Sequence, residues 1–128
     1  MGEMLFMAHS GVRYLVLLAG LIAAVLAAAS LRRGTLTRAG EVAGQAFVAT
    51  IDVQVVLGLG VVFTRPFYGA LIGHIVMMAA AATVAHAVWA RVKRQPAGAR
   101  PARLMLAGAV GALALIVAAI LAIGRPIV

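Results

Sequence analysis

The chain contains no cysteine and very little negative charge. The lack of cysteine excludes disulfides, iron–sulfur clusters, thiolate metal sites and covalent haem attachment through a C-x-x-C-H motif. The only acids are Glu3, Glu41 and Asp52, so the chain offers no pair of neighbouring carboxylates for acid–base catalysis. Charged residues make up only 11 % of the chain, against about 25 % in soluble domains. An ordinary soluble enzyme domain is therefore excluded.

Apolar residues take the place of the missing charge, at 65 % of the chain with a mean hydropathy of +1.12. They form four runs, at Leu5–Leu31, Val42–Phe63, Phe67–Trp89 and Leu104–Ile123. A helix of about 20 residues crosses the roughly 30 Å hydrocarbon core of a bilayer. The first run follows Glu3 and is too long for a signal peptide, so it is expected to be retained. The pattern predicts an all-α integral membrane bundle of four helices, a single transmembrane domain over residues 1–128.

The formal net charge of +8 is concentrated between these runs. Eight of the eleven basic residues lie in or directly beside two connecting segments, residues 32–41 and 92–103: Arg32, Arg33, Arg38, Arg91, Lys93, Arg94, Arg100 and Arg103. Basic loops beside apolar spans are typical of the cytoplasmic side, next to anionic lipid headgroups. A nucleic-acid partner would need a folded polar face, which the chain does not have. Lipid is the predicted partner, and both termini are expected on the outer side.

The connections between the runs are short, which predicts sequential antiparallel neighbours in an up–down–up–down order. The third run should begin directly after the turn TRPFY, residues 64–68, with Pro66 at the first helical position. A weak internal repeat supports two related hairpins. His9 precedes Arg65-Pro66 by 56 residues, and His74 precedes Arg125-Pro126 by 51. The repeat predicts that His9 and His74 lie at the same depth near the outer face.

His9 and His74 are the first candidate site. They belong to the first and third helices, which lie diagonally across a four-helix bundle, so both rings should point into the same central volume. This arrangement suits bis-imidazole ligation of one haem iron. Three outer arginines could neutralise the haem propionates: Arg13, Arg65 and Arg125. The simpler alternatives are that His9 lies at the wet interface, that His74 is structural, and that each arginine extends to lipid headgroups.

His86 forms a different group with two polar residues of the second helix, Asp52 and Gln54. It lies twelve residues beyond His74, about 18 Å deeper in a helix and about 120° around it. An acid inside a span is costly and needs a polar partner. A structural Asp52–His86 pair is one interpretation. A proton or quinone site formed by Asp52, Gln54 and His86 is the second, and an unusual ligand to a second haem is the third.

Methionines near the candidate ligands leave copper open as another cofactor. Met77 and Met78 lie three and four residues after His74, and Met7 precedes His9. Thioether and imidazole ligands suit Cu(I). Methionine is equally common as an apolar filler between helices.

Three stretches carry a resemblance to a known group: HSGVRYLVLL at residues 9–18, IDVQVVLGL at 51–59 and HIVMMAAAATVAH at 74–86. They resemble small bacterial membrane proteins described as cytochrome-b-like, and the plan is distantly similar to the cytochrome b561 type. The resemblance implies a bacterial inner-membrane protein that holds haem b between histidines and transfers electrons, with a redox partner such as quinol. The fourth run carries no such motif.

The chain departs from the b561 pattern because two bis-histidine haems need four histidines and it has three. One haem is the most that the pattern predicts. Two other functions remain open. One is a cofactor-free accessory subunit of a larger respiratory or photosynthetic membrane complex. The other is a membrane protein that handles copper or a small solute.

Overall fold

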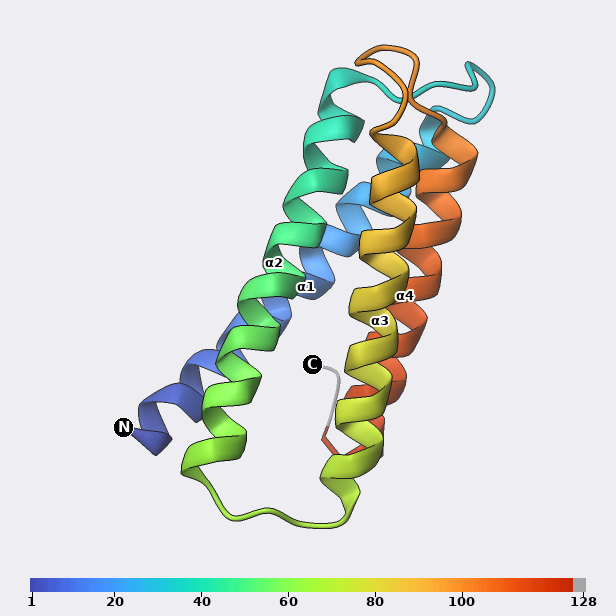
Figure 1. Ribbon diagram of the computed structural model, residues 1–128. Coiled ribbons are helices and arrows are strands. Elements are labelled where there is room, and N and C mark those ends of the chain that lie inside the picture. Colours follow the sequence, from blue (N-terminus) through green and yellow to red (C-terminus); the bar gives the residue numbers. More distant parts are fainter. Residues whose placement is uncertain (126–128) are drawn as a thin grey trace.

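Four long helices form a bundle in the computed structural model, which describes residues 1–125 (Figure 1). They are α1 (Gly2–Ala29), α2 (Arg38–Thr64), α3 (Ala70–Val92) and α4 (Ala102–Ala122). Each is long and apolar enough to cross a membrane, and consecutive helices run in opposite directions. The predicted all-α four-helix membrane bundle is confirmed.

The helices are continuous because no proline interrupts them. Pro66, Pro96 and Pro101 lie in the connections, and Pro126 lies outside the described residues. In a bilayer a helix also satisfies its own backbone groups, which lipid cannot do. α2 begins at Arg38, inside the segment expected to be a loop. The hydroxyl of Thr37 accepts a hydrogen bond from the backbone N–H of Gly40 at 3.1 Å and so caps the helix.

The expected start of the third helix is wrong. α3 begins at Ala70, and Pro66 lies in an extended connection. α2 ends at Thr64, and Arg65 has φ −127° and ψ 156°. Steric conflict with the ring of a following proline favours this extended backbone for Arg65. The connection of residues 65–69 therefore spans the distance between α2 and α3 (Figure 1).

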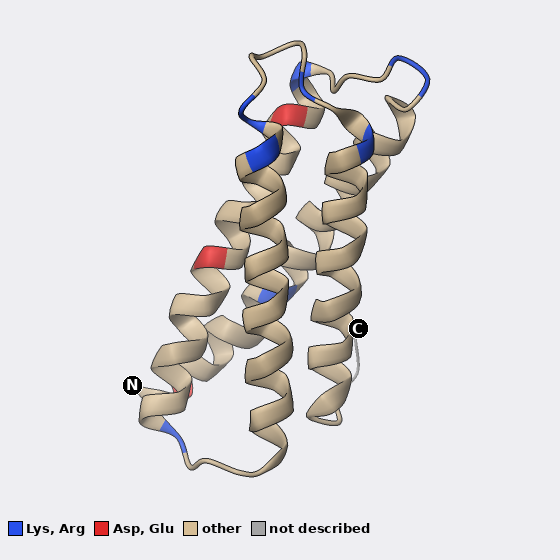
Figure 2. Ribbon diagram, turned by 45° about the vertical axis from the view of Figure 1, so that its right-hand side comes forward, with Lys and Arg blue, Asp and Glu red and all other residues tan. Residues whose placement is uncertain are grey.

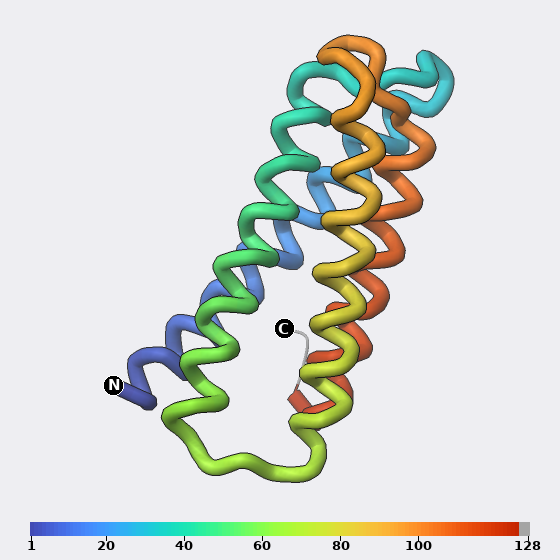
Figure 3. The backbone as a smooth tube through the Cα atoms, in the orientation of Figure 1, coloured from blue at the N-terminus to red at the C-terminus, as the bar shows by residue number. Residues whose placement is uncertain are grey.

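The helices pack as two hairpins, α1–α2 and α3–α4. α1 also packs on α4, whereas α2 and α3 contact each other sparsely. α1 and α3 are thus diagonal, as the sequence predicts. The hairpins are close where the α1–α2 and α3–α4 loops lie, and they diverge toward the α2–α3 connection (Figures 1 and 3). We call these ends the basic end and the open end.

The close-packed core lies in the basic half of the bundle. The buried apolar residues of α1 begin at Val16, those of α2 end at Ile51, and those of α3 begin at Ala81. α1 and α3 begin at the open end and α2 ends there, so the open-end segments of these three helices contain no buried apolar residue among those described. Only α4 has buried apolar residues closer to that end, up to Ile120. The open half is therefore where the bundle has room for a ligand.

The two loops at the basic end are tied together. Leu36 N–H donates to the Arg100 carbonyl at 2.8 Å, and Ala102 N–H donates to the Gly34 carbonyl at 3.1 Å. Glu41, only 3 % exposed, accepts from the backbone N–H of Gly98 at 2.8 Å and lies 3.4 Å from Arg100 Nη1. Lysine and arginine gather at this end (Figure 2).

Candidate functional site

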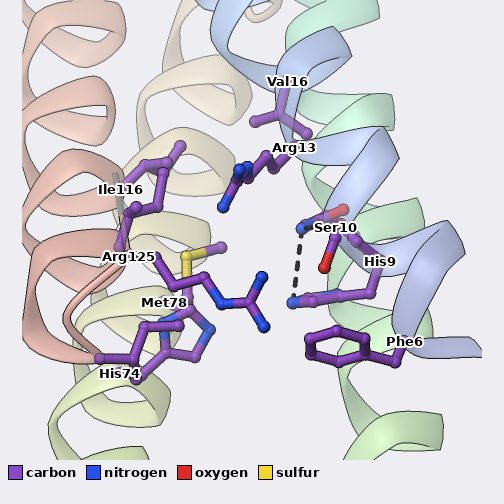
Figure 4. A pocket seen from close by; sticks show the side chains of 12 residues that line it. Phe6, His9, Ser10, Arg13, Val16, His74, Met78, Ile116 and Arg125 are labelled. Atoms are coloured by element: carbon purple, nitrogen blue, oxygen red, sulfur yellow. Dashed lines mark hydrogen bonds between the residues drawn. The ribbon is translucent and has the colours of Figure 1, made fainter. Parts of the chain in front are cut away.

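His9 of α1 and His74 of α3 meet across the open half of the bundle. Their ring centroids are 6.2 Å apart, and the ring planes are inclined at 78°. The two side chains project toward each other from opposite walls of the pocket (Figure 4). The sequence prediction that these histidines share one depth and one central volume agrees with this geometry.

His74 is oriented by the backbone of α4. Its Nδ1 lies 2.8 Å from the carbonyl oxygen of Ala119. A carbonyl only accepts, so Nδ1 must carry the proton and Nε2 of the neutral ring has a free lone pair. Histidines that ligate metals are commonly held in this way, with the second ring nitrogen donating to a carbonyl. His74 is thus prepared as a ligand through Nε2.

His9 is held by α2. A Cβ added to Gly58 would lie 3.1 Å from His9 Cε1, so the imidazole packs closely against the glycine. The side-chain amide of Gln54 donates to the His9 carbonyl at 2.9 Å, and the same nitrogen lies 3.5 Å from His9 Nε2. Gly58 lies one turn after Gln54, so both residues belong to the α2 face that positions His9.

Within residues 1–125, three buried polar atoms around this pair have no hydrogen-bond partner: His9 Nδ1, Gln54 Oε1 and Arg13 Nε. An unsatisfied buried polar atom is costly, and native sites with such atoms usually bind a ligand or an ordered water. Arg13 uses its Nη2 to donate to the Tyr14 hydroxyl at 2.7 Å. The unpaired atoms lie on the lining of a cavity and point to a polar or metal-bearing occupant.

The cavity lies between α2 and α3 and has a volume of about 570 Å³. This volume is within the usual range for cofactor and ligand pockets, about 300–1,000 Å³. A smaller central cavity of about 50 Å³ adjoins it, and both share His9, His74, Gln54 and Met78. The lining is otherwise mainly apolar. The space suits a large, flat, mostly apolar group with a polar centre.

Arginines surround the open end of this space. The guanidinium groups of Arg65 and Arg125 lie 4.3 Å and 4.6 Å from the centroid of the Phe6 ring, and both residues line the larger cavity. Arg13 lines the smaller one. Within residues 1–125 the ion pairs are Asp52–His86 and Glu41–Arg100, so the three arginines expected at the site meet no described carboxylate. They are available to an anionic ligand.

Asp52 and His86 form a separate pair on the outside of the bundle. His86 Nε2 lies 2.6 Å from Asp52 Oδ1, and the two side chains are 52 % and 53 % exposed. Gln54, which the sequence grouped with them, instead faces His9 and is 5 % exposed. Two residues along a helix rotate the side chain by about 200°, to the opposite face. The three residues therefore do not form one site.

The methionines that left copper open are dispersed. Met78 lines the cavity, whereas Met77 is 36 % exposed and Met7 is 65 % exposed. No cluster of three or more histidine or acidic side chains occurs in the described part of the chain. The two histidines and Met78 are the donors that the structure brings together.

Sequence reasoning missed Phe6 and the positions of Gln54 and Gly58 beside His9. Gln54 and Gly58 have the spacing of one helical turn, which would have placed them on one face. Phe6 could not be singled out, because apolar residues are common throughout the chain.

Comparison with protein families, with characterised proteins and with solved structures found no match. The resemblance to cytochrome-b-like membrane proteins therefore stays a prediction.

Proposed function

We propose that this protein is a b-type haem protein of a bacterial inner membrane that transfers electrons, and that His9 and His74 are the residues that would hold the haem. The observation that carries the proposal is the facing histidine pair beside a cavity of about 570 Å³. Imidazole nitrogens bind metal ions at about 2 Å. Two imidazole rings that would hold one metal ion between them are therefore roughly 6 Å apart between centroids, once the ring radius is added on each side, and the His9 and His74 rings are 6.2 Å apart.

The surroundings also fit a haem. His74 has its Nε2 free because Nδ1 is bonded to the Ala119 carbonyl. Gly58 leaves space for the His9 ring, and a side chain at that position would displace it. Arg65 and Arg125 at the open end would pair with the two propionate carboxylates. When bound, haem would supply a one-electron iron couple whose potential depends on axial ligands, burial and nearby charge.

The residues of the chain have distinct tasks in this proposal. His9 and His74 would hold the haem between α1 and α3. The apolar walls from α2 and α3 exclude water and keep the local dielectric low. The propionate carboxylates of the haem would be stabilised by the positive charges of Arg65, Arg125 and Arg13. By the positive-inside rule, the open end would lie on the periplasmic side, together with the N-terminus. Electrons would then enter and leave near that face through a redox partner or a larger membrane complex.

The direct test is optical. The full chain is expressed with haem available, purified in detergent and measured as a dithionite-reduced minus oxidised difference spectrum. We expect the α-band of a low-spin b haem in the wild type and its loss in His9→Ala and His74→Ala. His86→Ala is the matched control, because His86 contacts Asp52 outside the cavity, and it should keep the band. A colourless wild type would overturn the proposal.

A further inference from the structure

The Asp52–His86 pair lies where an isolated helix bundle in lipid should have no polar groups. Both residues belong to spanning helices, and each side chain is half exposed on the outer face shared by α2 and α3. Ionisable groups in membrane spans almost always face the bundle interior or a water-filled cavity, because hydrocarbon does not solvate them. A protein surface packed on this face would remove the pair from lipid.

The residues around the pair suit another helix. Six exposed positions of α2 follow each other at alternating intervals of four and three residues: Gln45, Ala49, Asp52, Val56, Leu59 and Phe63. This is the spacing of a seam at which two helices pack. On α3 the exposed residues Ala79, Thr83 and Ala90 flank His86. Small and hydroxylated residues allow close helix approach in membranes.

The cavity is open on the same side. Its lining includes Leu59 of α2, which is 55 % exposed, and Ile75 of α3, which is 41 % exposed. Leu59 belongs to the exposed α2 row described above, and Ile75 lies near the start of α3. Both residues therefore lie toward the open end, where the hairpins diverge (Figure 3). A helix pair laid over this face would cover the exposed ion pair and the open side of the cavity together.

We propose that the occupant is a second copy of this chain, in a parallel dimer with its twofold axis along the membrane normal. In such a dimer each residue can meet only residues of the same depth, so Asp52 and His86 face the same pair in the second copy. Within one copy Nε2 of His86 contacts Oδ1 of Asp52. The Nδ1–H of a protonated His86 can then donate to Oδ2 of Asp52 in the second copy, and the reverse bond forms by symmetry. The two His86 and two Asp52 side chains then have no net charge together, so no charged group of another protein is needed to balance them.

Cysteine cross-linking tests the dimer directly, because the chain has no cysteine of its own. Ala49→Cys and Ala90→Cys place single thiols on the α2–α3 face. Leu18→Cys on α1 and Val110→Cys on α4 are matched controls, since these residues are 53 % and 51 % exposed on the other helices. Oxidation of native membranes should give covalent dimers of twice the chain mass from Ala49→Cys and Ala90→Cys, and none from the controls. Equal cross-linking from all four positions, or adducts formed only with other proteins, would overturn the proposal.

The ion pair is tested separately within the Ala49→Cys background. Asp52→Asn with His86→Gln keeps side-chain size and removes both charges. Polar contacts between membrane helices contribute enough that dimerisation should weaken by about three- to tenfold. Unchanged cross-linking would show that the pair does not hold the interface. Helical circular dichroism verifies that the variant folds, and neither readout requires haem, so failure here leaves the haem proposal standing.

Discussion

His9 and His74 lie at one depth but are held by different means. His74 is fixed by a hydrogen bond from Nδ1 to the Ala119 carbonyl, a backbone group that substitution of a side chain does not remove. His9 depends on the shape of α2, because its ring fills the space beside Gly58. The His9 side of the site is therefore the side that single substitutions on α2 can perturb.

Gly58→Val should impair haem binding. The added side chain would meet His9 Cε1, since even a Cβ at this position lies only 3.1 Å from it, and the ring would be displaced. Substitutions that disturb the support of a metal ligand typically cost about 10- to 100-fold in affinity. Haem titration of the purified protein measures the loss. Gly60→Val is the control, because its Cβ meets the mobile end of Leu5 at 3.2 Å. Equal haem affinity in both variants would contradict the assigned position of His9.

Arg65→Gln and Arg125→Gln should lower the midpoint potential of the bound haem. A positive charge near the iron favours the reduced state, because the reduced iron has one positive charge less. Removing the arginine charge therefore favours the oxidised state. At a separation of about 10 Å and an effective dielectric constant near 20, the interaction is on the order of 1 kcal/mol, or tens of millivolts for one electron. Potentiometric titration measures the shift. Arg38→Gln at the basic end is the control and should leave the potential unchanged.

At the scale of the helices, the bundle is held by close approach at a few glycines. A Cβ on Gly108 of α4 would collide with the Val88 side chain, whose Cβ lies only 2.7 Å from that position. A Cβ on Gly20 of α1 would lie 2.8 Å from Phe47 Cε1 of α2. The same added atom on Gly20 would lie 2.9 Å from Leu113 Cγ of α4. The two hairpins therefore meet closely at Gly20, and they diverge beyond it toward the open end (Figure 1).

Gly108→Ala should destabilise the protein, whereas Gly111→Ala on the same helix should not. The alanine methyl group at position 108 would force Val88 and α3 away from α4, and overpacking of this kind costs about 1–3 kcal/mol. At position 111 the nearest atom is Val84 Cγ1 at 3.7 Å, an ordinary contact. Thermal unfolding in detergent, followed by circular dichroism, compares the two variants. A similar change in melting temperature for both would contradict the assigned α3–α4 packing.

At the scale of the whole molecule, hydropathy and spacing predict the helix number, the antiparallel order and the meeting of His9 with His74. They do not predict the cavity, because its size depends on how far the hairpins diverge. That divergence depends on side-chain contacts between the hairpins, such as Gly20–Leu113, which connect residues distant in sequence. The extended connection after Thr64 was missed for a related reason, since its length depends on the gap it crosses. Gln54 was grouped with Asp52 because similar depth does not specify which face of α2 a side chain occupies.

The orientation in the membrane follows from the charge at the basic end and is directly testable. Gly69→Cys places a thiol in the α2–α3 connection, and Ala97→Cys places one in the α3–α4 loop; both positions are exposed. A membrane-impermeant maleimide should label Gly69→Cys in intact spheroplasts, and Ala97→Cys only after permeabilisation, as the positive-inside rule predicts for basic loops. The opposite labelling pattern would invert the proposed location of the site.

Haem content per chain is the measurement that tests the central claim most directly. The wild type and three single variants, His9→Ala, His74→Ala and His86→Ala, are purified side by side after expression with excess haem. Haem is counted as the pyridine haemochrome against protein from amino-acid analysis. The proposal predicts about one haem per chain in the wild type and in His86→Ala, as one histidine pair allows, and almost none in the other two variants. Full haem content in both His9→Ala and His74→Ala, or no haem in the wild type, would contradict it.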